Sequence, residues 1–268
     1  MSQVPLTRMK FGETTRIDMW WLKPLAIFIG LTTFIVYSTW AALQNGDYMV
    51  AGTGYLSPFY SPILFGPEGG AHSAWFGSLP EGWPDLLRSP AIFILWAPAG
   101  FRLTCYYYRG AYYKSHWASP LACGVGKPHK NYTGERSFPL IVQNLHRYFL
   151  YLALGFILVL SYDAYCGMWF ATTTGAAEFG IGVGTLVMTM NVILLSLYTL
   201  GCHSLRHLVG GAKDVLSGNP IRKKAYDCVS CLNKSHQKWA WMSLFWVGFT
   251  DVYVRLCSMG VLVDWRIL

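Results

Sequence analysis

The segment YFLYLALGFILVLSYDAYCGMWF, from Tyr148 to Phe170, decides the fold class. It is a long apolar run in which Asp163 is the one charged side chain. A helix of about 20 predominantly apolar residues crosses the ~30 Å hydrocarbon core of a bilayer. The segment therefore predicts a membrane-spanning helix.

The whole chain has the composition of an integral membrane protein. Of its 268 residues, 53% are hydrophobic and only 13% are charged, too few charges to cover the surface of a soluble globule. The segment 90–108 carries the weakest signal, because it contains Pro98 and Arg102. We expect an all-α membrane protein that forms a single membrane domain over residues 1–268, with five transmembrane helices at 22–42, 90–108, 148–170, 181–200 and 239–259.

The distribution of basic residues predicts the orientation of these helices. Most of the 21 Lys and Arg side chains lie before the first span or in the loops 109–147 and 202–238. Positively charged loops stay in the cytoplasm, so we expect a cytoplasmic N-terminus, a C-terminus outside and a long outside loop at 44–89. The first apolar run is too long for a removable signal peptide, which predicts a retained helix.

The same bias explains the formal net charge of +8. No nucleic-acid-binding motif accompanies the charge, so a nucleic acid is not an expected ligand. Anionic lipid headgroups, or an acidic protein docked from the cytoplasm, are better candidates for binding these basic residues.

Two short motifs in the loop 202–238 carry chemistry: CHSLRH begins at Cys202 and CVSC begins at Cys228. If the helix of the fourth span continues for one more turn, His203 and His207 lie on one face, about 5–6 Å apart at Cβ. On the predicted cytoplasmic side a structural disulfide between Cys228 and Cys231 is disfavoured. A thioredoxin-type dithiol is also disfavoured, because the motif lacks a βαβ setting.

The two motifs together predict a metal centre with two imidazole and two thiolate ligands. The expected ligands are His203, His207, Cys228 and Cys231, with Cys202 and His236 as alternates. Such a set suits either zinc or a Rieske-type [2Fe–2S] cluster, and the spacing does not decide between them. The usual Rieske forms, C-x-H and C-x-x-H, are absent. The structural alternative is a pair of interfacial histidines beside lipid headgroups.

A b-type heme is a weaker expectation. It needs axial histidines from facing helices at membrane depth, and His146 is the other histidine close to a span. One heme between His146 and His203 or His207 remains open, whereas two bis-histidine hemes would need four well-placed histidines.

Three stretches resemble the membrane anchor of the mycobacterial type of succinate dehydrogenase: YRGAYYKSHWASPLACGVG from Tyr108, LGCHSLRHLVGG from Leu200 and CVSCLNKSHQKWAW from Cys228. The likeness covers most of the chain after about Arg109 and is looser before it. In that family a five-helix, heme-free subunit carries a Rieske-type cluster. The resemblance implies a multi-pass protein of the bacterial cytoplasmic membrane. It also implies a flavoprotein subunit, an iron–sulfur subunit, lipid and quinone as partners.

The resemblance further implies that this subunit passes electrons through the cluster to menaquinone and performs no succinate chemistry itself. The motifs above would supply the cluster ligands. His146 and Arg147 would offer hydrogen bonds to a quinone, and Trp20 or Trp241 would form a ring wall. The simpler alternative is that Arg147 anchors the topology and the tryptophans belong to an interfacial belt. The alternatives for the whole chain are a heme b anchor and a structural membrane protein stapled by zinc, and the oligomeric state stays open.

Overall fold

The computed structural model describes residues 9–66, 72–80, 82–84, 87–129, 134–172, 175–211 and 213–268. The first eight residues of the predicted cytoplasmic N-terminal segment, and parts of the loops 44–89 and 109–147, lie outside the described residues. The chain forms two compact units. Unit 1 comprises residues up to 36 and 100–146, and unit 2 comprises 37–99 and 147–268. The expectation of a single membrane domain stays a prediction.

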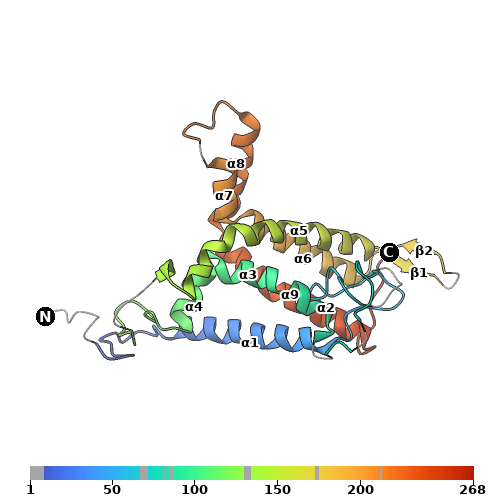
Figure 1. Ribbon diagram of the computed structural model, residues 1–268, viewed down its shortest axis with the longest axis horizontal. Helices are drawn as coiled ribbons and strands as arrows, with labels where there is room; N and C mark the ends of the chain where they lie inside the picture. The colour runs from blue at the N-terminus through green and yellow to red at the C-terminus, as the bar shows by residue number, and fades with distance from the viewer. Residues whose placement is uncertain are drawn as a thin grey trace. The chain divides into compact units, whose positions relative to one another are not determined.

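The fold is helical, as predicted, with one small β-hairpin (Figure 1). Strand β1 (Trp169–Ala171) pairs antiparallel with β2 (Ala177–Phe179). Two short 3₁₀ helices, η3 (Gly134–Arg136) and η4 (Leu140–Leu145), precede α5. The α-helices are α1 (Leu22–Gln44), α2 (Pro90–Ile94), α3 (Trp96–Thr104), α4 (Tyr106–Ser115), α5 (His146–Cys166), α6 (Val183–Leu200), α7 (His203–Gly210), α8 (Pro220–Lys234) and α9 (His236–Ser258).

Within the described residues, three helical segments are long and apolar enough to cross a membrane: Leu22–Gln44, Leu140–Cys166 and Val183–Leu200. They correspond to the first, third and fourth predicted spans. Helix α9 has 23 residues, but Asp251 and Arg255 interrupt its apolar sequence and are buried in unit 2. The count of five spans and the orientation of the termini stay predictions.

The expectation of one continuous helix over 90–108 is wrong, because α2, α3 and α4 follow one another there. Pro98 has no backbone N–H to donate to the carbonyl of Ile94, where α2 ends. The second break is at Cys105, which adopts an extended conformation with ψ 130°. Just before it, the Thr104 hydroxyl donates to the carbonyl of Gly100 at 2.7 Å, a contact that bends helices.

Buried carboxylates attach the first part of the 44–89 loop to the helices of unit 2. Ser57 donates to Asp251 of α9, and Ser61 donates to Asp163 of α5. The Tyr37 hydroxyl also donates to Asp251, at 2.6 Å. A carboxylate without partners would be costly in this interior, so these bonds fix residues 57–61 against two helices.

The C-terminal segment returns to the start of α6 in the same unit. The Asp264 carboxylate accepts hydrogen bonds from the Tyr253 hydroxyl at 2.5 Å, the Gly184 backbone N–H at 2.8 Å and the Tyr55 hydroxyl at 2.7 Å. It therefore satisfies a free N–H at the first turn of α6, where negative charge is favoured. Gly184 is required there, because a Cβ atom would lie 2.4 Å from the Tyr55 ring.

Helices α7 and α8 occupy the other end of unit 2. Gly201 and Cys202 interrupt the chain after α6, and Cys202 is extended with ψ 140°. Helix α7 starts there as a separate helix, so the condition that the fourth span continues for one more turn is not met, although His203 and His207 still lie on one helix. Figure 1 shows α7 and α8 projecting from the long helices α5 and α6.

Asp264→Ala removes three hydrogen bonds at once and should lower the free energy of unfolding by about 2–4 kcal/mol, because each bond to a charged group contributes about 1.5–3 kcal/mol and the three are not additive. The measurement is the thermal stability of the purified protein complex. The matched control is Asp227→Ala, which removes only the exposed pair with Lys223 at 3.0 Å, for which about 0.5 kcal/mol is expected. Equal effects of the two variants would contradict the anchoring role of Asp264.

Candidate metal centre and quinone-binding residues

Helix α7 brings the two predicted imidazole ligands together. His203 and His207 are one turn apart, and their Nε2 atoms lie 3.0 Å from each other. Their ring centroids are 4.5 Å apart, with an interplanar angle of 77°. Two nitrogens bound to one metal ion at 2.0–2.1 Å lie about 2.8–3.4 Å apart for angles of 90–110°. The distance is thus compatible with a metal chelate, and in this structure it is also that of an N–H···N hydrogen bond between the two rings.

The surroundings of His203 favour its neutral form. Partial burial lowers the pKa of His203, and the nearby His207 and Arg206 lower it further. A metal ion binds the neutral ring, so the lowered pKa keeps His203 available as a ligand toward mildly acidic pH.

The two predicted thiolate ligands lie on α8. Cys228 and Cys231 are three residues apart on this helix, and both side chains are exposed. Residues three apart share one side of a helix, which places the two sulfurs on the same side of α8. None of the seven cysteines forms a disulfide bond in this structure, which describes all of them.

The four predicted ligands fit a metal centre in part. The histidine half is arranged for one ion, but in the described part of the chain no three His, Cys, Asp or Glu side chains are grouped to hold a metal. The assignment of all four residues to one centre stays a prediction. A centre with all four ligands would require the exposed thiols of α8 to approach α7.

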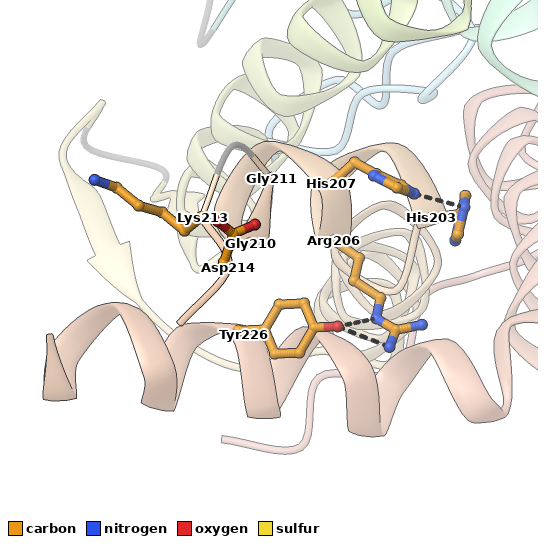
Figure 2. Close-up of a pocket in the computed structure, with 8 residues that line it drawn as sticks. All are labelled: His203, Arg206, His207, Gly210, Gly211, Lys213, Asp214 and Tyr226. Carbon is orange, nitrogen blue, oxygen red and sulfur yellow. Dashed lines mark hydrogen bonds between the residues drawn. The ribbon is translucent and has the colours of Figure 1, made fainter. Parts of the chain in front are cut away.

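Side chains of α8 pack against α7 and against the residue that follows it. Tyr226 accepts hydrogen bonds from Arg206 Nε at 3.1 Å and Nη2 at 2.8 Å (Figure 2). Arg222 donates to the carbonyls of Val209 and Gly211, the latter at 3.0 Å. These contacts join the C-terminal end of α7 to the first half of α8.

A cavity of about 410 Å³ opens beside the histidine pair. Figure 2 shows both imidazoles on one side of it and Tyr226 on another. Arg206 and Lys213 contribute positive charge, and Asp214 contributes a carboxylate. The net positive lining favours a ligand, or a redox change, that adds negative charge.

The alternate ligands Cys202 and His236 lie at the starts of α7 and α9. Cys202 is 1% exposed and precedes α7 as its N-cap residue. His236 begins α9 and stacks on Tyr198 of α6, with centroids 5.0 Å apart and an interplanar angle of 18°. His236 thus has a packing role between α6 and α9.

The predicted quinone ligands are divided between the two units. In unit 1, the His146 ring stacks on Phe101 at 4.9 Å, and Trp20 precedes α1. In unit 2, Arg147 is exposed, and Trp241 stacks on Phe245 at 5.7 Å. Their assignment to a quinone stays a prediction.

Sequence reasoning missed the residues that position α7. Arg222 and Tyr226 are four residues apart in a stretch that the sequence indicates only as basic and polar. The sequence indicates Gly210 only as part of a turn, yet a Cβ atom there would lie 2.5 Å from the Tyr226 ring. The spacing of Arg222 and Tyr226 on one helical face was the available signal.

Comparisons with known proteins agree with this architecture. The family model described as "Actinobacterial succinate dehydrogenase subunit SdhC" matches residues 22–260. A chain of the Mycobacterium smegmatis Sdh1 complex in the apo form is similar over 100% of this chain and 96% of its own length. It shares 41% sequence identity, with a TM-score of 0.86. None of the curated proteins matches the chain.

The match spans nearly all the described helices, and the expected resemblance is confirmed. The protein is a membrane-embedded component of a succinate dehydrogenase complex, whose other subunits are its partners. The chain belongs to the family of actinobacterial succinate dehydrogenase SdhC subunits, the membrane anchors of mycobacterial-type succinate dehydrogenase.

Proposed function

We propose that this anchor passes electrons from the iron–sulfur subunit of the complex to menaquinone in the bacterial cytoplasmic membrane. We propose further that it carries a Rieske-type [2Fe–2S] centre, with His203 and His207 as imidazole ligands and Cys228 and Cys231 as thiolate ligands. The observation that supports this most strongly is the 3.0 Å approach of the two Nε2 atoms on α7.

The chemistry of the donor set supports iron–sulfur binding over a simple packing role. Two imidazoles whose Nε2 atoms lie 3.0 Å apart can both bind one metal ion when the proton between them is released. A centre with two imidazole and two thiolate ligands has a higher reduction potential than one with four thiolates, which suits electron transfer toward a quinone. Arg206 and Lys213 beside the imidazoles stabilise added negative charge and favour the reduced state.

In this proposal the chain contributes to quinone reduction through residues that bind the head group of the quinone. His146 is the proposed hydrogen-bonding partner of a quinone oxygen, with Arg147, Trp20 and Trp241 as further candidates. The succinate chemistry would belong to the partner subunits. The family match favours this anchor role over a zinc-stapled structural protein or a heme anchor.

Replacing His203 or His207 by Ala should abolish the Rieske-type EPR signal of the reduced complex and lower its iron and acid-labile sulfide content by that of one [2Fe–2S] cluster. Cys228→Ser and Cys231→Ser should have the same effect. Reduction of quinone by succinate should fall at least ~100-fold, because the electron path is broken. Reduction of a soluble dye, which takes electrons from the partner subunits, should persist.

The controls are His129→Ala and Cys123→Ser, which remove an exposed histidine and an exposed cysteine outside the proposed ligand set. Both should leave the EPR signal and the quinone activity unchanged. A wild-type complex that contains zinc at this site, without a Rieske-type signal, would disprove the proposed centre.

Gly210→Ala tests whether the packing of α7 on α8 positions the imidazoles. The added Cβ atom would lie 2.5 Å from the Tyr226 ring. Such overpacking costs about 1–3 kcal/mol and should shift α7, weakening or broadening the EPR signal. At Gly218 a Cβ atom meets nothing within 4 Å, so Gly218→Ala is the matched control. An unchanged signal in Gly210→Ala would show that the fit between α7 and α8 does not position the ligands.

A further inference from the structure

The C-terminal segment of unit 2 runs alongside the residues that lead into α6. The backbone N–H of Val183 donates to the carbonyl of Trp265 at 3.0 Å, and the N–H of Ile267 donates to the carbonyl of Ile181 at 2.7 Å. We call residues 261–268 the C-terminal strap. Its backbone polar groups are thus partly satisfied by the start of α6.

The strap is extended at this point, because Arg266 forms an antiparallel bridge with Gly182. Successive side chains of an extended segment point to opposite faces. One face of the strap therefore carries Asp264 and Arg266. The opposite face carries Trp265 and Ile267.

The charged face of the strap turns toward the protein. Asp264 accepts the N–H of Gly184 at 2.8 Å. The Arg266 guanidinium lies over the Phe170 ring, 5.1 Å from its centroid, and donates to the carbonyl of Phe179 at 3.2 Å. Both charged side chains of the strap are therefore bound by unit 2 itself.

The other face of the strap is apolar and points away from the protein. Val263 and Trp265 are 88% and 78% exposed, and Ile267 is also exposed. Where one face of an extended segment meets water, the polar side chains are on that face and the apolar ones face the core. The strap has the reverse arrangement, which is favourable where the surroundings are apolar.

The length of α6 indicates where the strap lies relative to a bilayer. The 18 residues of α6 are long and apolar enough to cross a membrane. They rise about 27 Å, close to the ~30 Å thickness of the hydrocarbon core. The first residue of α6, Val183, therefore lies near one edge of the core, and the strap that pairs with it lies at the same edge. His203 follows the opposite end of α6.

Exposed aromatic side chains of neighbouring segments gather at the same end of unit 2. Trp169 of β1 and Phe179 of β2 meet edge to face, with centroids 5.9 Å apart. Tyr165, in the last turn of α5, contacts Trp169 at 6.1 Å and is exposed as well. Figure 1 shows the C-terminus beside this hairpin. Tryptophan and tyrosine are enriched at the level of lipid headgroups, where an apolar ring and a polar atom are both accommodated.

We propose that the C-terminal strap lies in the membrane interface at the end of unit 2 opposite α7, with Val263, Trp265 and Ile267 in contact with lipid. The occupant is bilayer lipid because the apolar face of the strap continues the exposed apolar surface of the membrane-crossing helices, where Leu158 and Leu186 are exposed. The backbone pairing with residues 181–183 removes polar groups that lipid chains cannot satisfy. This placement is independent of the proposed electron transfer.

Trp265→p-benzoylphenylalanine and Val263→p-benzoylphenylalanine test the proposal in the whole complex, reconstituted in liposomes of dioleoylphosphatidylcholine. Illuminated benzophenone forms a bond with a neighbouring C–H group, and mass spectrometry of the digested chain identifies what was captured. Both positions should gain the mass of a whole phospholipid. The yield should be within about twofold of that at Leu158, since lipid surrounds all three positions, and at least about tenfold above that at Lys224, exposed on the polar helix α8.

Both replaced side chains are largely exposed, so the substitutions should leave the packing of unit 2 intact. Succinate oxidation with a soluble dye checks that each variant complex is assembled. If the variant at Trp265 does not assemble, the variant at Val263 decides the matter.

Two results would overturn the proposal. Capture of another protein chain at either position, whether a second copy or a partner subunit, would make the strap an interface between chains. A lipid yield as low as that at Lys224 would place the strap in water.

Discussion

Polar groups withdrawn from water must find partners, and this constraint organises the chain more than any single apolar contact. Asp251 and Asp163, 0% and 3% exposed, are bonded to Ser57 and Ser61. Asp264 receives three donors at the start of α6. These carboxylates attach residues 55–61 and the C-terminal segment to α5, α6 and α9 of unit 2.

At the opposite end of unit 2, the chain places polar side chains outside the apolar helices. Gly201 and Cys202 interrupt the helix, so α7 leaves the direction of α6 and places His203 and His207 outside the apolar helices. Their nitrogens approach each other at 3.0 Å, an arrangement that binding of a metal ion would stabilise. At one end of the unit the buried carboxylates are hydrogen-bonded within the protein. At the other end the imidazoles of α7 are placed where they could bind a metal ion.

Much of this could be predicted from local sequence pattern. Apolar runs predict α1, α5 and α6, because length and hydropathy are properties of the segment alone. The one-turn spacing of His203 and His207 predicts their approach for the same reason. The likeness to mycobacterial succinate dehydrogenase anchors is also a property of the amino-acid sequence, because the Cys202 and Cys228 motifs carry it.

Contacts between distant segments could not be predicted in this way. The partner of Ser57 is Asp251, 194 residues away, and no local pattern links them. The direction of the CVSC thiols depends on how Arg222 and Tyr226 pack α8 on α7. Pro98 signals the break at α2, whereas the extended conformation of Cys105 depends on tertiary structure.

The most direct test of the proposed centre asks whether two histidine nitrogens bind it. The purified complex, labelled with ¹⁵N-histidine and reduced, would be measured by electron–nuclear double resonance on its iron–sulfur signals. Coordination by His203 and His207 predicts couplings from two histidine nitrogens that disappear when both residues are replaced. A reduced complex without histidine coupling, or with couplings that survive the double replacement, would contradict it.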